Sequence, residues 1–544
     1  MINKLSRFYH TVKYLKFKQI IWRIASVLPR LVFEVNNYPS NIELIKSNHF
    51  ILRDRITNDY VNFTFLNETN NTNVIGWDGK HTSKLWQYNL HYFDCLLQSK
   101  FTSNSLDDQI QLIENWIDNN PFGKETGWEP YPTSLRIINW IKWHWSCNGL
   151  TNKAKLSLWN QVRWLKNRPE YHLLGNHLFV NVKALLFACA FYGFNSENKY
   201  FKLANSILLK ELDEQFLEDG AHFELSPMYH ALAMEDLLDL ISISDSLPPE
   251  FPLNLVKKKY LKGMFWLQSM VYQNEELSHF NDCANNIAPK ISELISFASH
   301  LNLKHSNYFH GLVYHNKSGF VVFKNNIFHL IADIGHIGPT YLPGHAHADT
   351  LSFELCIKGE RIIVNSGTSV YGISDERLRQ RGTLSHSTIE IDGKNSSEVW
   401  SGFRVARRAK TFDIQIESLS NTEKIFTFKA SHDGYNLLKN SPIHTRSFKL
   451  EENSCTINDS VSGFGNQIKS NFYLHPNIDV SKSDSYLLLS KNQTNFVKLV
   501  FDKNIDFDII KSTYHDQFGI TKANKCIQFK INSPFNMSIK FEIL

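Results

Sequence analysis

The stretch LSFELCIKGERIIV, residues 351–364, decides the fold class of the C-terminal part of the chain. Its apolar residues alternate with a period of two, at Leu351, Phe353, Leu355 and Ile357. This period is typical of a β-strand. Lys358-Gly359-Glu360 predicts a tight turn, and residues 361–364 predict a returning strand. The stretch as a whole therefore predicts a β-hairpin.

The same alternation continues on both sides of this hairpin. It begins near residue 315 and is clear again at Phe412, Ile414 and Ile416. Ile389 and Ile391 lead into a turn at Asp392-Gly393. Short strands separated by Asn, Asp, Gly and Ser up to residue 544 predict an antiparallel sandwich or stacked sheets.

Before about residue 300 the apolar pattern is helical. After Pro227, the apolar residues with i, i+3, i+4, i+7 spacing are Met234, Leu237, Leu238 and Ile241. This spacing predicts a helix with one buried face, which Pro248-Pro249 ends. Further helices are predicted over residues 134–145 and 175–192. Successive helices joined by short turns indicate a helical toroid or array.

The change of period predicts a multidomain α and β protein. We expect a helical domain with an N-terminal extension over residues 1–310 and a β-sandwich domain over residues 311–544. The boundary is predicted within residues 302–318. Ligand sites favour the cleft between two such domains.

Composition excludes several classes of protein. With 42% hydrophobic and 20% charged residues among 544, the chain is a folded protein and not a disordered one. A net charge of +5 is too small to indicate nucleic-acid binding. Aromatic residues make up 13%, which fits either a large aromatic core or a cleft that binds sugar rings.

Cysteine spacing and the hydropathy pattern exclude other classes. The seven cysteines lie at least 42 positions apart, so a CxxC knuckle and a dense disulfide framework are excluded. The basic, aromatic N-terminus shows no ordinary signal peptide, and it could pack on the toroid or touch a membrane. Residues 178–191 are apolar but short, which predicts a buried helix and no transmembrane segment.

The first candidate functional cluster is Gly175-Asn176-His177 at the start of a predicted helix. Asn176 could simply be the helix N-cap. Alternatively, Asn176 and His177 could bind an anion such as a sugar carboxylate at the helix N-terminus.

The second cluster is DGAHFELSPMYH, residues 219–230, which is too polar for an ordinary core connection. Tyr229 could act as a general acid, or as a general base if nearby cations lower its pKa. The alternative is a packing tyrosine whose hydroxyl is hydrogen-bonded. His230 is a further candidate for substrate binding.

The third cluster is Gly344-His345-Ala346-His347, just before the hairpin. The i, i+2 histidines would share one face of a regular strand, and a bend would separate them. His386 is a candidate third ligand for a metal. Arg377, Arg379 and Arg381 form a basic stripe that is either a solvated strand face or a clamp for carboxylates. A fourth segment, residues 127–132, offers Trp128 and Glu129 for a sugar subsite or for packing.

These segments together resemble the heparinase II/III family of polysaccharide lyases, particularly members found with bacterial surface-polysaccharide genes. The stretches that carry the resemblance are WQYNLHYFD (86–94), GWEPYPTSLRIINW (127–140), GNHLFVNVKALLF (175–187), DGAHFELSPMYHALAMEDLLD (219–239), GHAHADTLSFEL (344–355) and EVWSGFRVARR (398–408). The family fold is an N-terminal incomplete (α/α) toroid followed by a β-sandwich. The resemblance implies β-elimination at a uronic acid of an acidic polysaccharide.

Residue roles follow from the resemblance, motif by motif. Asn176 and His177 resemble the residues that neutralise the substrate carboxylate. Tyr229 resembles the proton-transfer tyrosine, and His345 resembles the histidine that completes the acid–base pair. Arg379 or Arg381 would assist with substrate charge.

Several members of the family also hold a structural zinc ion through His, Asp and His. His347 and His386 match the two histidines, but Asn365 stands at the position of the aspartate. Asn can ligate through its carbonyl oxygen but brings no negative charge, and zinc sites favour Cys, His and carboxylate ligands. A structural zinc held by His347, His386 and Asn365 therefore stays open for this chain.

Two other functions stay open at the level of sequence. A glycoside hydrolase would use two carboxylates, with Glu129, Asp219, Glu224 and Asp282 as candidates. A glycan-binding or assembly protein would keep the fold without activity. The resemblance implies a location in the cell envelope or periplasm, with the cytoplasm as the alternative, and the sequence does not specify the oligomeric state.

Overall fold

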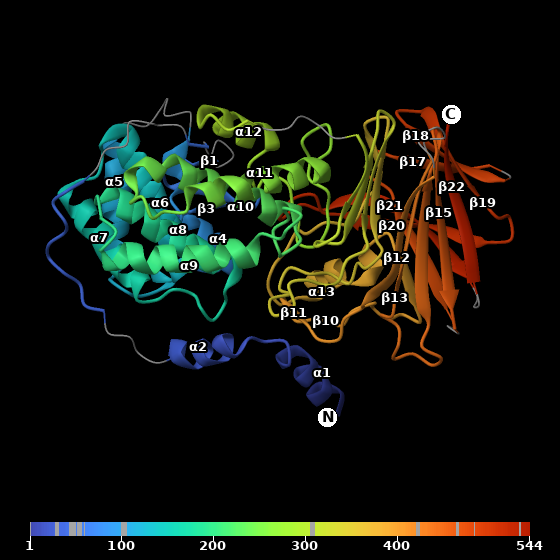
Figure 1. The fold of residues 1–544 in the computed structure, drawn as a ribbon, viewed down its shortest axis with the longest axis horizontal. Coiled ribbons are helices and arrows are strands. Elements are labelled where there is room, and N and C mark those ends of the chain that lie inside the picture. Colours follow the sequence, from blue (N-terminus) through green and yellow to red (C-terminus); the bar gives the residue numbers. More distant parts are fainter. Residues whose placement is uncertain are drawn as a thin grey trace.

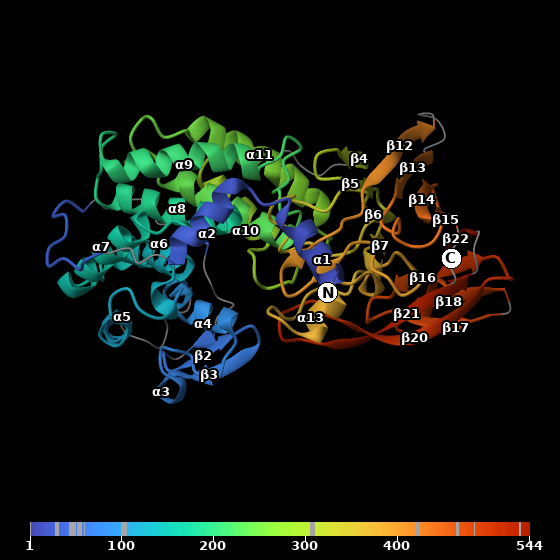
Figure 2. The same ribbon diagram turned by 90° about the horizontal axis from the view of Figure 1, so that it is seen from below.

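The computed structural model describes residues 2–27, 32–42, 50–51, 57–58, 60–98, 106–304, 310–419, 425–463, 467–483, 485–531 and 535–544. Its helical half and its sheet half lie side by side along the longest axis, as Figure 1 shows. Two N-terminal helices, α1 (Ile2–Val12) and α2 (Phe17–Val27), lie along one side of both halves (Figures 1 and 2).

The helical half is a set of packed helices around one core. They are α3 (Thr72–Ile75), α4 (Lys84–Leu90), α5 (Leu106–Asn119), α6 (Pro130–Cys147), α7 (Asn152–Lys166), α8 (Gly175–Phe191), α9 (Lys199–Gln215), α10 (Pro227–Ser242), α11 (Leu253–Met270) and α12 (Ile291–His300). The predicted helices over 134–145, 175–192 and after Pro227 are α6, α8 and α10. Helix α8 is buried along almost its whole length, as its apolar composition predicts.

A small sheet precedes these helices, and the sequence pattern did not predict it. It consists of β1 (Thr57–Asn58), β2 (Asn62–Phe65) and β3 (Glu68–Asn71) in the order β1-β2-β3. Leu66 and Asn67 both have positive φ, which is the geometry of a two-residue hairpin turn. The strands are too short for their alternation to be recognised.

Among the described residues, the C-terminal half contains three larger antiparallel sheets and a two-stranded one, β10-β11. A five-stranded sheet has the order β4-β5-β6-β7-β8, a four-stranded sheet the order β20-β21-β16-β9, and an eight-stranded sheet the order β12-β13-β14-β15-β22-β19-β18-β17. The strands of the five-stranded sheet are β4 (Gly311–His315), β5 (Phe320–Lys324), β6 (Phe328–Asp333), β7 (Phe353–Ile357) and β8 (Glu360–Ile363). One hydrophobic core joins residues of all three sheets.

The remaining strands complete the sandwich. They are β9 (Ile389–Ile391), β10 (Val399–Trp400), β11 (Arg404–Val405), β12 (Thr411–Leu419), β13 (Ile425–His432), β14 (Ile443–Leu450), β15 (Ser454–Ser462), β16 (Ile468–Tyr473), β17 (Asp479–Lys482), β18 (Tyr486–Lys491), β19 (Thr494–Phe501), β20 (Asp506–Tyr514), β21 (Lys522–Ile531) and β22 (Phe535–Ile543). A short helix, α13 (Asp375–Arg381), interrupts them. The predicted order of a helical part followed by antiparallel sheets is confirmed.

The hairpin over residues 351–364 forms strands β7 and β8, with one difference from the prediction. Lys358 and Gly359 both have positive φ, which matches the right-handed twist of the paired strands. Strand β7 begins at Phe353 because Leu351 also has a positive φ, at 62°. The chain therefore bends just before the strand, next to the histidine segment.

A separate hydrophobic cluster joins the two halves. Trp266 and Met270 of α11 pack with Phe320 and Val322 of β5 and with Ile331 of β6. The Trp266 indole also donates a hydrogen bond to Ser318 Oγ at 3.1 Å. This interface sets the position of the first turns of α8 and α10 relative to the loop before β7.

Candidate active site

The start of α8 has a backbone that only glycine suits. Gly175 has φ +59°, and a Cβ there would come within 2.7 Å of Glu224 Oε1 and 2.6 Å of Leu342 Cδ2. The residue before the helix is Leu174, which makes no side-chain cap. Asn176 therefore lies inside the first turn, and the interpretation of Asn176 as the N-cap is wrong.

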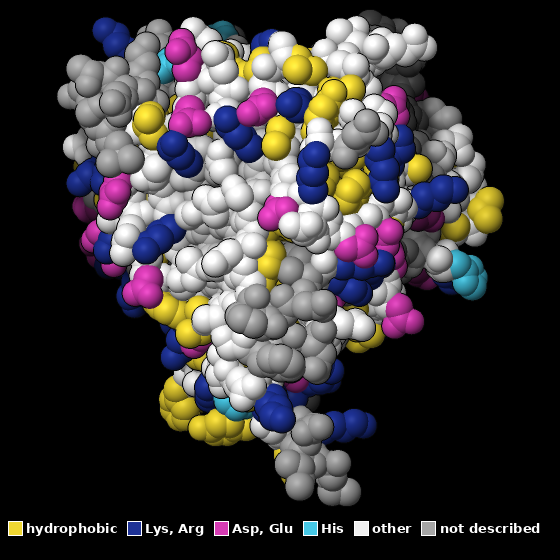
Figure 3. Space-filling model, turned by 90° about the vertical axis from the view of Figure 1, so that its right-hand side faces the viewer, with side chains coloured by type: hydrophobic (Ala, Val, Ile, Leu, Met, Phe, Trp, Pro, Cys, Tyr) yellow, Lys and Arg dark blue, Asp and Glu magenta, His cyan; other side chains and the backbone are white. Residues whose placement is uncertain are grey.

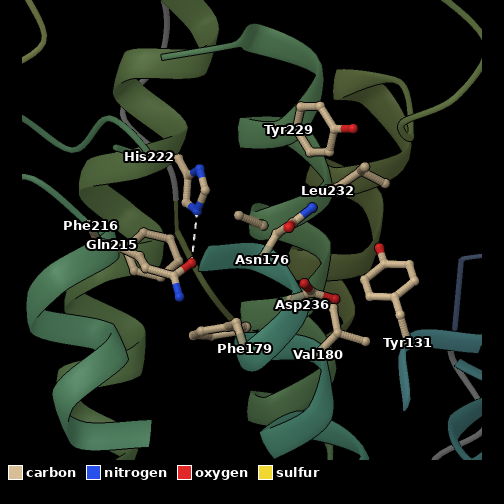
Figure 4. A pocket seen from close by; sticks show the side chains of 11 residues that line it. Tyr131, Asn176, Phe179, Val180, Gln215, Phe216, His222, Tyr229, Leu232 and Asp236 are labelled. Atoms are coloured by element: carbon tan, nitrogen blue, oxygen red, sulfur yellow. Dashed lines mark hydrogen bonds between the residues drawn. The ribbon is translucent and has the colours of Figure 1, made fainter. Parts of the chain in front are cut away.

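The side chain of Asn176 faces a cavity at the end of the helical half. The cavity has a volume of about 310 Å³, part of it open to solvent, and Figure 4 shows Tyr131, Asn176, Tyr229 and Asp236 among the residues that line it. His222 also lines it and is held by Gln215 Oε1 at 3.0 Å.

His177 is held beside this cavity by a buried carboxylate. Its Nδ1 lies 3.1 Å from Glu170 Oε1, and the other oxygen of Glu170 accepts a hydrogen bond from Asn181 Nδ2 at 3.1 Å. The His177 ring lies 4.4 Å from the ring of Tyr131. Burial alone would lower the pKa of His177, but the Glu170 carboxylate overcomes this effect and raises it. His177 can therefore carry positive charge at a helix N-terminus, which favours an anion.

Tyr229 lies in the first turn of α10, after the N-cap Ser226. Its ring centroid is 4.0 Å from that of His345, although the two residues are far apart in sequence. Its hydroxyl is 2.9 Å from the hydroxyl of Tyr371. Burial, and then the neighbouring Tyr371, raise the pKa of Tyr229 well above its ordinary value. Tyr229 is therefore a phenol that can donate a proton.

His345 is oriented by a buried aspartate from the helical half. Its Nδ1 lies 2.9 Å from Asp282 Oδ2, and His347 Nε2 lies 2.9 Å from Asp282 Oδ1. The segment before β7 is not a regular strand, and the two histidines approach the same carboxylate. In a neutral His345 ring, an N–H at Nδ1 leaves the lone pair on Nε2.

Asp282 is itself fixed by Arg377. The guanidinium binds both carboxylate oxygens, with Arg377 Nη2 2.6 Å from Oδ2, and both side chains are fully buried. Burial opposes the charge on Asp282, but Arg377 and the two histidines hold the pKa of that carboxyl well below its usual range. The pair forms a rigid support behind His345.

Glu224 is a second carboxylate near His345. It is almost fully buried, with Oε1 accepting the backbone N–H of Asn176 at 3.4 Å and Oε2 3.7 Å from His345 Nε2. Burial raises the pKa of Glu224. This carboxyl therefore links the helix start that carries Asn176 to the ring of His345.

The structure bears on two predicted substrate-binding residues, Trp128 and His230. Trp128 is a core residue, 5% exposed, whose indole donates to Asn120 O at 3.1 Å. His230 is fully buried, and both its nitrogens bond to backbone groups of His222 and Gly263. Both side chains are buried and hydrogen-bonded inside the protein, which argues against their interpretation as substrate-binding residues.

The arginine stripe is divided between two faces of helix α13. Arg381 is fully buried and donates to the backbone oxygens of Ala346 and Ser401, so its assignment to substrate is wrong. Arg379 is partly exposed and bonds to Glu376 and His515. Arg377 was not among the arginines expected to contact substrate, but it is the one that binds Asp282 behind His345.

The four carboxylates proposed for a hydrolase do not form a free pair. Asp282 is bound by Arg377, and Asp219 accepts the backbone N–H groups of Lys317 and Ser318. Glu129 is partly exposed but bonds to Lys84 and Tyr88. Only Glu224 keeps an oxygen without a hydrogen-bond partner. A hydrolase needs two available carboxyl groups across the scissile bond.

The three predicted zinc ligands do not point at one centre. His347 Nδ1 and His386 Nε2 face each other at 3.3 Å, but Asn365 Oδ1 lies 3.2 Å from His386 Nδ1, on the opposite edge of that ring. Among the described residues, no group of three or more His, Cys, Asp or Glu has a metal-binding arrangement. Zinc prefers four ligands, so these residues do not fit a complete site.

Some site residues carried no usable signal in the sequence. Tyr371 and Glu170 lie outside the motifs, and only their contacts with Tyr229 and His177 identify them. Asp282 was a candidate only for a hydrolase carboxylate, and its contact with His345 was not predicted.

Comparisons with known proteins agree with this architecture. Residues 55–302 match the family model described as heparinase II/III N-terminus, and residues 310–541 match heparinase II/III-like, C-terminal. A heparin-sulfate lyase of Bacteroides stercoris is 25% identical over 248 residues, which are 41% of this chain and 37% of the relative. The corresponding protein of Pedobacter heparinus is 26% identical over 247 residues, 41% of this chain and 36% of the relative.

Solved structures share the fold at low identity. A crystal structure of heparinase III has a TM-score of 0.64 at 16% identity and covers 97% of this chain and 89% of that one. The Streptomyces coelicolor chondroitin AC lyase in complex with chondroitin sulphate has a TM-score of 0.51 at 7% identity, covering 85% and 74%. These likenesses establish the toroid-plus-sandwich fold.

Proposed function

Since this chain belongs to the heparinase II/III family, we propose that it is a polysaccharide lyase that cleaves an acidic, uronic-acid-containing polysaccharide by β-elimination. The observation that carries the proposal is the meeting of Tyr229 with His345, at a ring distance of 4.0 Å, beside a helix start that presents Asn176 and His177.

The first requirement of β-elimination is charge stabilisation at the uronate carboxylate. His177 keeps its charge to higher pH because Glu170 raises its pKa, and Asn176 can donate through its amide. Both lie at the N-terminus of α8, where the helix dipole also favours an anion. A single preorganised donor of this kind contributes about 3–4 kcal/mol to a developing oxyanion.

The second requirement is a base and an acid on the reacting bonds. His345, whose Nδ1 is bonded to Asp282, would accept the C5 proton on Nε2. The electron pair of the C5–H bond forms the C4–C5 double bond as the C4–O bond breaks. The phenol of Tyr229 then protonates the leaving oxygen; its raised pKa keeps it protonated before this step.

The test is the formation of unsaturated uronides, measured by their ultraviolet absorbance and by product mass. Heparan sulfate is the first substrate to try because the two curated relatives are heparin-sulfate lyases, followed by a broad uronate panel. Tyr229→Phe should lower kcat by about 10²–10⁴-fold. Tyr314→Phe, on strand β4 away from the cavity, is the matched control. Products without a double bond, or wild-type rates in Tyr229→Phe, would contradict the proposal.

We further propose the cell envelope as the place of action, because an acidic surface polysaccharide is found there. Within the part of the chain that the structure describes, no helix is long and apolar enough to cross a bilayer. Fractionation of producing cells with an antibody against the chain tests the location.

A further inference from the structure

The N-terminal helices α1 and α2 are attached to the body through polar residues. Gln19 is fully buried and bonds to Tyr341 O at 3.5 Å, and Thr11 accepts a hydrogen bond from Trp400 Nε1 at 3.1 Å. Arg7 pairs with Glu398 of the sandwich at 2.7 Å, and Lys16 pairs with Glu214 of the helical half. The two helices thus form a strap that contacts both halves.

The apolar residues of the strap face outward. Leu5, Phe8 and Tyr9 of α1 follow i, i+3, i+4 spacing and are 62–65% exposed. Phe17, Ile21 and Ile24 of α2 follow i, i+4, i+7 spacing and are 46–75% exposed. This is the reverse of an ordinary surface helix, whose apolar stripe faces the core.

Exposed apolar residues are also more concentrated in this N-terminal segment than in the rest of the described chain. Of the seventeen large hydrophobic side chains exposed in the described residues, seven lie between Leu5 and Phe33. Figure 3 shows hydrophobic side chains gathered with Lys and Arg on the lowest part of the molecule, where Figure 1 places α1 and α2. A contiguous patch of this kind marks an interaction surface.

The charge of the strap indicates what covers the patch. The first 33 residues contain seven Lys or Arg and no Asp or Glu; Arg7 and Lys16 pair with carboxylates of the body, and the other five add to the positive charge of the segment. A second copy of the chain would bring the same basic face against itself, because a two-fold interface pairs identical surfaces. An anionic bilayer instead matches both properties, since basic residues bind the headgroups and apolar side chains insert between them.

We propose that α1 and α2 dock this protein on an anionic membrane surface, lying in the plane of the interface without crossing it. Trp22 of α2 packs at 4.8 Å on Tyr171 of the helical half, so α2 docks against the body on the side opposite its exposed apolar residues. The proposal does not depend on lyase activity.

The experiment is vesicle flotation of the full chain. Binding to phosphatidylglycerol–phosphatidylcholine vesicles is expected, with little binding to phosphatidylcholine alone and a decrease as salt is raised. The triple variant Phe8→Ser/Phe17→Ser/Ile24→Ser should bind about tenfold more weakly or worse. Val74→Ser/Leu437→Ser removes apolar side chains that are 82% and 71% exposed elsewhere and should bind like wild type.

Three outcomes would overturn the proposal. The first is no binding to anionic vesicles at low salt, and the second is equal binding of the triple variant. The third is a wild-type dimer by light scattering that the triple variant converts to a monomer without any vesicle binding by either protein. That result would assign the face to a second copy of the chain.

Discussion

The charge of His177 depends chiefly on Glu170, which is 4% exposed and lies 3.1 Å away, with smaller contributions from Glu224 and Glu129. Because the pKa of His177 is raised above the ordinary 6.5, the imidazolium persists as the pH rises past that value. The stability from this pair is fully present below pH 6.5 and is lost as the pH rises through the raised pKa. Binding of a carboxylate should follow the same direction.

We therefore expect Glu170→Gln to move the alkaline limb of the kcat/KM profile to lower pH. Well above pH 6.5, kcat/KM of the variant should approach that of His177→Ala, for which we expect a loss of about 10²–10³-fold. The measurement is the pH profile of initial rates. Glu197→Gln, which removes an exposed partner of Lys202, should leave the profile unchanged. An identical profile for Glu170→Gln would assign the carboxylate a purely structural role.

At the residue scale, motif spacing predicted which side chains gather but not how each one is used. Asn176, His177, Tyr229 and His345 do meet, and their catalytic roles stay a prediction. The choice among the arginines failed for a geometric reason. In a strand, Arg377, Arg379 and Arg381 would share one face. They lie in the helix α13 instead, where Arg377 and Arg381 are four positions apart and both face inward, and Arg379 faces outward.

At the scale of elements, burial was the property that the sequence did not reveal. Trp128 and His230 have the chemistry of sugar-binding residues, and both lie in the core. Helix α10 and strand β7 were predictable because their apolar residues repeat with the period of a helix and of a strand. The β1–β3 sheet has strands of two to four residues, too few to show a period.

The connection between β8 and β9 gives a prediction about metal. His347 and His386 offer two converging nitrogens, and Asn365 bonds to the far edge of His386. Burial lowers the pKa of both histidines, which favours the neutral rings that zinc also binds, so the expectation rests on the position of Asn365 at the far edge of His386. We expect well below one zinc per chain by mass spectrometry after dialysis, and no change in Tm on adding a chelator. Stoichiometric zinc together with a lower Tm after chelation would contradict this expectation.

At the scale of the whole molecule, the candidate site exists only where the two halves meet. Asn176, His177 and Tyr229 come from the helical half, and His345 and Tyr371 come from the sandwich side. Asp282 of the helical half bonds to Arg377 and His345 across this junction. A small change in the relative position of the halves should therefore affect catalysis more than a similar loss of stability elsewhere.

Trp266→Ala tests this coupling, because Trp266 fills the interface cluster and bonds to Ser318. We expect the free energy of unfolding to fall by about 3–5 kcal/mol. We also expect kcat to fall at temperatures where the variant is still folded, because a shift of about 1 Å in reacting groups can cost 10²-fold. Trp143→Ala is the matched control, since Trp143 is equally buried but lies in α6, inside the helical core. It should lose similar stability and keep its rate. Equal rate losses in the two folded variants would mean that the interface does not position the site.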